Sequence, residues 1–276
     1  MEILTAQHSG FCEGVERAYR VALEQTQAGQ KVFMLGKLVH NTQVVEKFEK
    51  AGVKTVSSLS EIPEQATVIF SAHGVPPQVY EEAKSRKMKV IDTSCGWVKK
   101  AQKIAKQFAD EDRQVVIVGD KGHTEVKGLV GWAGGGAKVI EGIEDIKGIE
   151  GKKIGILAQT TQSEERFMSI VASLRERFQD VKAHNTICDA TAKRQNAAVE
   201  LAQKVDLMLV IGDKMSANTK RLTELCAQTG TETHQIQTSK ELNSLWLKGK
   251  SEVGLTAGAS TPDWVVQEVV NRLNVC

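Results

Sequence analysis

The sequence lacks an excess of charge of either sign, because 36 lysines and arginines balance 34 aspartates and glutamates. A balanced chain creates no strong field toward nucleic acid or an anionic membrane, so neither is an expected partner. Aromatic residues are only 5% of the chain, too few for a platform on which single-stranded bases stack. The longest apolar runs, such as V-V-I-V and L-M-L-V-I, are far too short to cross a bilayer.

Signals for export and for nucleotide binding are also missing. The N-terminal M-E-I-L-T has no basic, apolar and cleavable pattern, and the five cysteines are odd in number and widely spaced. We therefore expect a cytoplasmic protein whose thiols serve metal binding or catalysis rather than a disulfide framework. Neither G-x-x-x-x-G-K-[ST] nor G-x-G-x-x-G occurs, so a nucleotide or nicotinamide cofactor is not expected.

What the sequence does contain is a repeat built on three cysteines. They stand in S-G-F-C-E-G-V, D-T-S-C-G-W-V and N-T-I-C-D-A-T, each after an extended stretch and before a helix-like run: Cys12, Cys95 and Cys188. The residues 28 positions further on each lie in a loop that opens another helix: His40, His123 and Ser216. Each segment also has an apolar strand that ends in a small polar loop, and these loops carry His73, Thr160 and Ser260.

Apolar strand-like runs alternate with amphipathic helical patterns, which predicts an α/β fold with parallel sheets covered on both faces. The predicted strands are residues 31–35, 67–70, 89–92, 114–118, 153–157, 206–211 and 252–256. The repeat predicts three similar lobes in a pseudo-threefold arrangement around a common centre. Their expected bounds are residues 13–95, 96–187 and 188–276, with residues 1–12 pairing onto the third lobe. Ser260 or Thr261 is the expected N-cap of the last helix.

The equivalent positions of the repeated cysteines favour a shared metal site. Cys226, within the helical run R-L-T-E-L-C-A, fits a buried hydrophobic role, and Cys276 at the end of the chain has no expected site role. Zinc is possible, but the C-x-x-C pairs of most structural zinc sites are absent. Three separated thiolates suit a [4Fe–4S] cluster, which usually takes four ligands, so that one iron is left open for substrate.

Polar residues at the carboxyl ends of the predicted strands favour an anionic ligand. A single histidine at a helix start is usually a cap, but three at comparable strand ends are better explained as a site: His40, His73 and His123. Helix N-termini there present free N–H groups, which favour phosphate. Neutral donors at the same kind of position are Ser216, Asn218 and Ser260. A small phosphate or diphosphate substrate is the expected ligand.

Glu125, in G-H-T-E-V, is the carboxylate beside these residues. A glutamate in the first turn of a helix commonly does no more than stabilise the helix dipole. Next to a buried cluster, the same side chain is a plausible proton donor with a raised pKa.

Taken together, these motifs resemble the 4-hydroxy-3-methylbut-2-enyl diphosphate reductase family over essentially the whole chain. The motifs are G-F-C-x-G-V, V-H-N, S-A-H-G-V, G-H-x-E-V-x-G, A-Q-T-T, I-C-x-A-T-x-x-R-Q, S-x-N-T and T-A-G-A-S-T-P-D-W. The resemblance implies a three-lobed fold around a central [4Fe–4S] cluster held by Cys12, Cys95 and Cys188. It implies a diphosphate site formed by His40, His73, Ser216, Asn218 and Ser260. It places His123, Thr160 and Glu125 around the substrate hydroxyl, with these three in the catalytic role.

Four positions depart from the pattern of the family. Gly96 and Thr124 stand where proline is usual, Ala217 replaces the second serine of S-S-N, and Asp189 follows Cys188. Ala217 removes one hydroxyl near the expected diphosphate, whereas its backbone N–H remains. We therefore expect weaker rather than abolished binding of the diphosphate.

The favoured hypothesis is an oxidoreductase that removes the allylic hydroxyl of (E)-4-hydroxy-3-methylbut-2-enyl diphosphate, giving isopentenyl and dimethylallyl diphosphate. The resemblance implies an external electron donor such as ferredoxin or flavodoxin. Two alternatives remain open from the sequence. One is a related [4Fe–4S] enzyme, a reductase or a dehydratase, that acts on a different small substrate. The other is a metal-cluster sensor that catalyses nothing.

Overall fold

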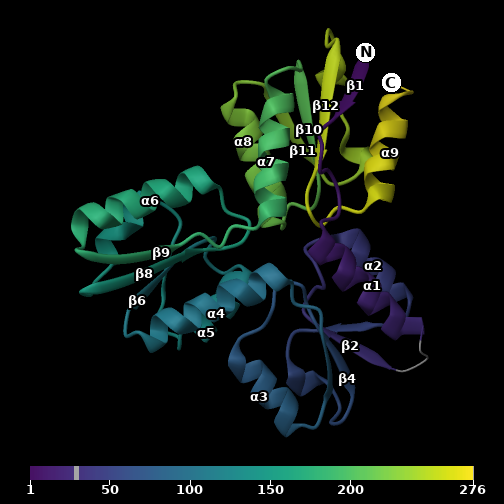
Figure 1. The fold of residues 1–276 in the computed structure, drawn as a ribbon. Helices are drawn as coiled ribbons and strands as arrows, with labels where there is room; N and C mark the ends of the chain where they lie inside the picture. Colours follow the sequence, from purple (N-terminus) through teal and green to yellow (C-terminus); the bar gives the residue numbers. More distant parts are fainter. Residues whose placement is uncertain (28–30, 276) are drawn as a thin grey trace. The chain divides into compact units, whose positions relative to one another are not determined.

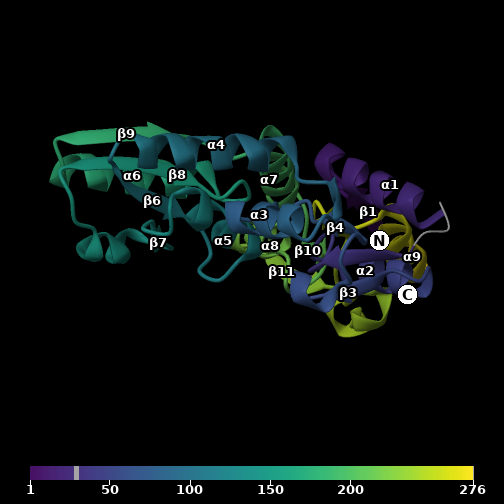
Figure 2. The same ribbon diagram turned by 90° about the horizontal axis from the view of Figure 1, so that it is seen from below.

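The computed structural model describes residues 1–27 and 31–275. Three parallel sheets of four strands each dominate this part of the chain, and helices connect the strands (Figure 1, Figure 2). The predicted α/β class is confirmed. The division into three lobes at the predicted residue boundaries stays a prediction.

The chain divides into two compact units, each described by itself below. Unit 1 comprises Met1–Glu16, His40–Val44 and Asp189–Cys276. Unit 2 comprises Arg17–Val39 and Val45–Cys188. Unit 1 holds one of the sheets, and unit 2 holds the other two.

The first sheet of unit 2 has the strand order β3-β2-β4-β5. Its strands are β2 (Val32–Leu35), β3 (Lys54–Val56), β4 (Thr67–Phe70) and β5 (Lys89–Asp92). The helices of this segment are α1 (Glu13–Gln27), α2 (Thr42–Lys50) and α3 (Pro77–Ser85). The central strand β4 is buried along its whole length, which accounts for its continuous apolar character in a sheet covered on both faces.

The second sheet of unit 2 repeats this order as β7-β6-β8-β9. Its strands are β6 (Gln114–Val118), β7 (Lys138–Ile140), β8 (Lys153–Ala158) and β9 (Asp180–His184). The helices are α4 (Gly96–Asp110), α5 (Thr124–Trp132) and α6 (Glu164–Arg177). The core of this sheet has two sides, one packed on α6 and the other on α4 and α5.

The sheet of unit 1 has the order β1-β12-β10-β11. Its strands are β1 (Glu2–Thr5), β10 (Leu207–Ile211), β11 (Glu232–Ile236) and β12 (Glu252–Ala257). The helices are α7 (Asp189–Ala202), α8 (Ala217–Gln228) and α9 (Asp263–Leu273). Because β1 pairs in parallel with β12, it takes the place that β5 and β9 take in the other two sheets.

The sequence analysis does not predict four of the edge strands: β3, β7, β9 and β11. Their sequences are K-T-V, K-V-I, D-V-K-A-H and E-T-H-Q-I, and most of their residues are partly or fully exposed. A strand at a sheet edge needs little apolar sequence because its side chains reach water, so no apolar run marks it. The predicted strands coincide with β2, β4, β5, β6, β8, β10 and β12 to within one residue at each end.

Short 3₁₀ turns follow the edge strands β3, β7 and β11. They are Leu59–Glu61, Ile143–Gly148, Ser239–Glu241 and Ser244–Leu247. Among the described residues, no helix combines the length and the apolar character that a membrane crossing requires.

Candidate active site

Each of the three repeated cysteines lies directly before a helix, as the sequence predicts. Cys12 precedes α1, Cys95 is the N-cap of α4, and Cys188 precedes α7. Each also follows an outer strand of a sheet, namely β1, β5 and β9. The three side chains are partly exposed. The free N–H groups and the positive dipole end at a helix N-terminus favour a negatively charged group beside each thiol.

The backbone of each cysteine is tied to the loop that follows the neighbouring central strand. The N–H of Cys12 donates to the carbonyl of Ala259 at 3.2 Å, and that of Cys95 donates to the carbonyl of Ala72 at 3.0 Å. In both cases the acceptor stands one position before a predicted site residue. The fold therefore fixes thiol and polar loop together within each unit.

The third of these bonds corrects the predicted alignment of the repeats. The N–H of Cys188 donates to the carbonyl of Thr160 at 3.1 Å, so Thr160 occupies the place of the two alanines. By this register, Thr161 is the counterpart of His73 and Ser260, one position beyond the predicted match. A one-residue shift is invisible in A-Q-T-T, where two threonines adjoin.

The loops 28 positions after the cysteines open helices as predicted. His123 is the N-cap of α5, and its Nδ1 accepts the N–H of Glu125 at 3.1 Å. Ser216 is the N-cap of α8, where its hydroxyl accepts a backbone N–H at 3.3 Å. The His40 loop opens α2, where the Asn41 side chain accepts a backbone N–H at 3.0 Å.

Glu125 and Thr160 form a buried pair within unit 2. Glu125 is only 2% exposed, and Thr160 is 5% exposed. The N–H of Thr160 donates to Glu125 Oε1 at 2.7 Å, and the Thr160 hydroxyl donates to Oε2 at 2.8 Å. Burial raises the pKa of Glu125 to about 7, although the two bonds from Thr160 oppose this shift. The carboxyl group can therefore hold a proton near neutral pH, in agreement with the raised pKa expected from the sequence.

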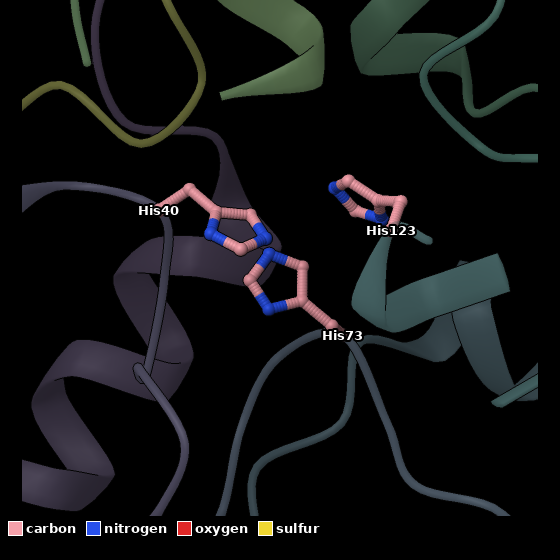
Figure 3. A group of neighbouring side chains, drawn as sticks. All are labelled: His40, His73 and His123. Atoms are coloured by element: carbon pink, nitrogen blue, oxygen red, sulfur yellow. The ribbon is translucent and has the colours of Figure 1, made fainter. Parts of the chain in front are cut away.

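Two predicted histidines meet in unit 2. The rings of His73 and His123 lie edge to face, with their centroids 5.5 Å apart. They come from the loop after β4 and from the start of α5, and α3, β5, α4 and β6 lie between these two segments in the chain (Figure 3). His40, drawn in the same figure, belongs to unit 1.

Unit 1 brings together three other predicted residues. The Ser260 hydroxyl donates to the carbonyl of His40 at 2.9 Å and lies 3.4 Å from the hydroxyl of Ser216. The expected N-cap role of Ser260 or Thr261 is wrong, because Pro262 is the N-cap of α9. With proline in that position, the Ser260 hydroxyl is turned to the His40 loop instead.

Asn218 lies in the first turn of α8, next to this group. Its side chain is only 4% exposed, and neither of its amide atoms has a hydrogen-bond partner among the described residues. A buried polar group left without a partner costs free energy, commonly about 1–3 kcal/mol. The amide of Asn218 therefore offers an unused donor and an unused acceptor in the first turn of α8.

Asp213, which the sequence analysis missed, joins the two loops of unit 1 that carry predicted site residues. Its Oδ2 accepts the N–H of Thr42 at 2.9 Å and the Thr42 hydroxyl at 2.7 Å. Its Oδ1 accepts the N–H of Met215 at 2.8 Å. One buried carboxylate thus holds the start of α2, after His40, against the turn that precedes Ser216.

The four departures from the family pattern share one structural position. Each is the first residue of a helix: Gly96 in α4, Thr124 in α5, Asp189 in α7 and Ala217 in α8. The first N–H of a helix has no intrahelical acceptor, so this position tolerates residues with and without that N–H. The helix starts beside the predicted site residues are therefore kept despite the substitutions.

Of the predicted site residues, unit 1 carries Cys12, His40, Ser216, Asn218 and Ser260, and unit 2 carries His73, Cys95, His123, Glu125, Thr160 and Cys188. Cys226 is fully buried on α8, and burial raises its pKa to about 12, so the predicted core role is confirmed. Cys276 lies outside the described residues.

The fold and these residues define an α/β protein of repeated parallel-sheet segments, each with a thiol and a polar loop at corresponding places. The sequence model of the LytB protein family matches residues 3–274. The chain belongs to this family, as the sequence motifs indicate.

Curated relatives match over almost their whole length. A protein from Geobacter metallireducens named 4-hydroxy-3-methylbut-2-enyl diphosphate reductase is 44% identical over 274 residues, covering 99% of this chain and 97% of its own. A protein of the same name from Clostridioides difficile is 39% identical, with 99% of each chain covered.

Solved structures agree with this result. The E-1-hydroxy-2-methyl-but-2-enyl-4-diphosphate reductase of Plasmodium falciparum is 31% identical, with a TM-score of 0.94 over 99% of this chain and 87% of that one. A second structure is described as (E)-4-hydroxy-3-methyl-but-2-enyl diphosphate reductase, the terminal enzyme of the non-mevalonate pathway. It is 39% identical, with a TM-score of 0.71 and full coverage of both chains.

Proposed function

We propose that this chain is a 4-hydroxy-3-methylbut-2-enyl diphosphate reductase that catalyses the last step of the methylerythritol phosphate (non-mevalonate) route to isoprenoids. The allylic C–OH bond is broken, a C–H bond forms, and the hydroxyl leaves as water. This change consumes two electrons and two protons and gives isopentenyl or dimethylallyl diphosphate. The observation that carries the proposal is the buried Glu125–Thr160 pair, which stores a proton, in a chain 44% identical to a reductase of this name.

Proteins of this family carry a [4Fe–4S] cluster, and the donors of this chain suit one. Three partly exposed thiols precede helices at matching places, and thiolates are the usual ligands of such clusters. We propose that Cys12, Cys95 and Cys188 each bind one iron and that the fourth iron stays open for substrate. When bound, the cluster would pass two electrons, one at a time, from an external donor and would offer a Lewis-acidic iron to the hydroxyl oxygen.

The diphosphate is held by neutral and imidazole donors. In unit 1 these are the amide of Asn218, the hydroxyls of Ser216 and Ser260, and the ring of His40, at the start of α2 and α8. His73 supplies a further imidazole from unit 2. Free N–H groups at a helix N-terminus add to the binding of an anion. Support for this role comes from the buried amide of Asn218, which lacks a partner among the described residues.

Glu125 supplies the proton that lets the hydroxyl leave as water. Its pKa of about 7 keeps a large share of the side chain protonated at neutral pH, and the Thr160 hydroxyl fixes its orientation at 2.8 Å. His123 accepts the N–H of Glu125 at 3.1 Å, which places its imidazole beside the same carboxyl group. The three residues together bind the hydroxyl end of the substrate.

The electrons come from outside the chain, because the sequence has no motif for a flavin or a nicotinamide cofactor. We propose a ferredoxin or a flavodoxin as the donor.

The experiment that tests this function is an anaerobic assay on protein with a reconstituted cluster. Oxidation of a reduced viologen dye should depend on (E)-4-hydroxy-3-methylbut-2-enyl diphosphate and should yield the two five-carbon diphosphates. Mössbauer spectra should show one iron distinct from the other three. Cys95→Ser should abolish the cluster, whereas the control Cys226→Ser should keep it, because Cys226 is buried in the core.

Two results would contradict the proposal. Stoichiometric zinc without iron or sulfide after reconstitution would exclude the cluster. Turnover of the diphosphate at full rate without any reductant would indicate a dehydratase instead.

A further inference from the structure

Helix α4 leads directly away from one of the proposed cluster ligands. Cys95 is its N-cap, and the helix runs on from Gly96 to Asp110. One face packs on the second sheet of unit 2 through Ala101, Ile104, Ala105 and Phe108, all buried. The opposite face is exposed to solvent. Burial of the apolar face therefore determines which side chains of α4 point outward.

The exposed face carries four lysines, defined here as the α4 lysine row: Lys99, Lys100, Lys103 and Lys106. Their spacing of one, three and three residues keeps them on one side of a helix over its first three turns. No acidic residue occurs in α4 before Asp110, its last residue. At about 1.5 Å per residue, Lys100 stands roughly 8 Å and Lys103 roughly 12 Å along the axis from Cys95.

Half of this row is not neutralised within the protein. Lys99 pairs with Asp92 at 2.8 Å, and Lys106 pairs with Asp110 at 2.6 Å. Lys100 and Lys103 form no ion pair with any residue that the structure describes. Lys100 instead lies 4.8 Å from the centre of the Trp97 ring. Two positive charges are therefore available to a partner.

A cavity of about 610 Å³ lies beside the row within unit 2. Its lining includes Tyr80, Asp92 and Trp132, together with Lys99, Lys103 and Lys106 of the row. Asp92 is paired with Lys99, which leaves Glu81 as the other carboxylate of the lining. The hollow beside the row is therefore mixed in character, because its lining combines the aromatic rings of Tyr80 and Trp132 with three lysines of the row.

We propose that the α4 lysine row docks an acidic electron-transfer protein. This inference rests on the proposed function, since a reductase without a flavin or nicotinamide must receive its electrons from another molecule. Each docking event delivers one electron and leaves the carrier oxidised by one, so two events serve one turnover. The chain has a net charge of only +2, so a local basic row, rather than the charge of the whole protein, steers an acidic partner.

The test compares two double variants that change the net charge equally. Lys100→Glu with Lys103→Glu reverses the two charges of the row that have no partner and leaves the Asp92 and Asp110 pairs intact. The control is Lys152→Glu with Lys153→Glu, two exposed lysines at the amino end of β8. The probe is an oxidised acidic ferredoxin, titrated into the cluster-loaded protein in a calorimeter at low ionic strength. Turnover is then measured with reduced ferredoxin and, separately, with a reduced viologen dye.

The row variant should weaken ferredoxin binding by roughly tenfold or more, and salt should reduce the difference from wild type because it screens exposed charges. Ferredoxin-driven turnover should fall by a similar factor, whereas dye-driven turnover and the cluster spectrum should stay at wild-type values. If the row variant bound ferredoxin as tightly as the wild type does, the docking site would be refuted. The same conclusion would follow if the row variant and the control lost the same amount of ferredoxin affinity.

The proposed function and the docking site can fail separately. Absence of dye-driven turnover in the wild type would refute the function, whereas the calorimetric comparison would still decide whether the row binds the carrier.

Discussion

Replacing Glu125 by glutamine should change how the stability of the protein depends on pH. The Glu125 carboxyl is 2% exposed and accepts two hydrogen bonds from Thr160, and its pKa rises from 4.5 to about 7, chiefly through burial. Glutamine has the same shape but carries no titrating proton. The variant therefore isolates the proton that the proposed mechanism requires.

The size of the effect follows from linkage between protonation and folding. Between pH 4.5 and about 7, the unfolded chain has lost the Glu125 proton while the folded chain still holds it. The folded state binds more protons there, so stability is lost as pH rises through this window. The pKa is 4.5 in the unfolded chain and about 7 in the folded chain. At 1.36 kcal/mol per pKa unit, this difference lowers the free energy of unfolding by about 3 kcal/mol between pH 4.5 and a pH above 7.

The measurement is the free energy of unfolding in urea from pH 4.5 to 8 for wild type and Glu125→Gln. The variant should gain about 3 kcal/mol relative to wild type across this range. The glutamine oxygen can accept only one of the two bonds from Thr160, and its NH2 group faces the other donor. That cost does not depend on pH, so the pH dependence of the unfolding free energy is the decisive measurement. Glu111→Gln is the control, because the pKa of this partly exposed carboxyl is lowered to about 2, below the window.

Turnover of the same variant gives an independent check. Loss of a general acid typically slows a reaction by about 10²–10⁴-fold, while binding of the diphosphate should survive. Parallel stability curves for wild type and variant would mean that Glu125 titrates normally in the folded chain. That result, or near-normal turnover with an intact cluster, would remove Glu125 from the mechanism.

Three further predictions concern the ligand cradle and the helix starts. Asn218→Ala should weaken binding of inorganic diphosphate by about 1–3 kcal/mol in calorimetry, and Ala217→Ser should strengthen it if the added hydroxyl reaches the anion; unchanged affinity in both would disprove the cradle. Asp213→Asn should weaken the same binding roughly tenfold with an unchanged cluster spectrum, whereas Asp206→Asn, at the other end of β10, should not. Gly96→Pro should raise the unfolding free energy by about 0.4–1 kcal/mol, because Cys95 is already extended and a Cβ at Gly96 meets nothing within 4 Å; a lower stability would contradict this.

The sequence predicts best where the structural signal is local. A cysteine between an extended stretch and a helical pattern marks a strand–loop–helix junction, and Cys95 directly precedes α4 as expected. The same holds for His123 and Ser216, which cap α5 and α8. In each case the apolar strand, the polar loop and the helix start lie within one short segment, so no distant contact is needed to recognise them.

Long-range contacts leave no such trace. Asp213 bonds to Thr42, a residue 171 positions away, and no pattern in G-D-K-M-S links the two segments. The partnership of Glu125 with Thr160 spans 35 positions, and burial decides the pKa of the carboxyl. The family motifs place Glu125 and Thr160 around the same substrate hydroxyl but do not give the contacts between them, and no motif marks Asp213.

The departures from the family pattern show why the fold and its site residues persist in a diverged chain. Gly96, Thr124, Asp189 and Ala217 all occupy the first position of a helix, where the backbone N–H has no intrahelical partner. A side chain there can change without loss of a helical hydrogen bond, and the next N–H groups of the turn remain free of intrahelical partners. A substitution at one of these positions changes the side-chain donors that the helix start can offer to an anion. The position of the helix start itself does not change. Ala217 is the case with a chemical consequence, since the proposed diphosphate site then relies on Asn218 and the α8 backbone where the family pattern has a second hydroxyl.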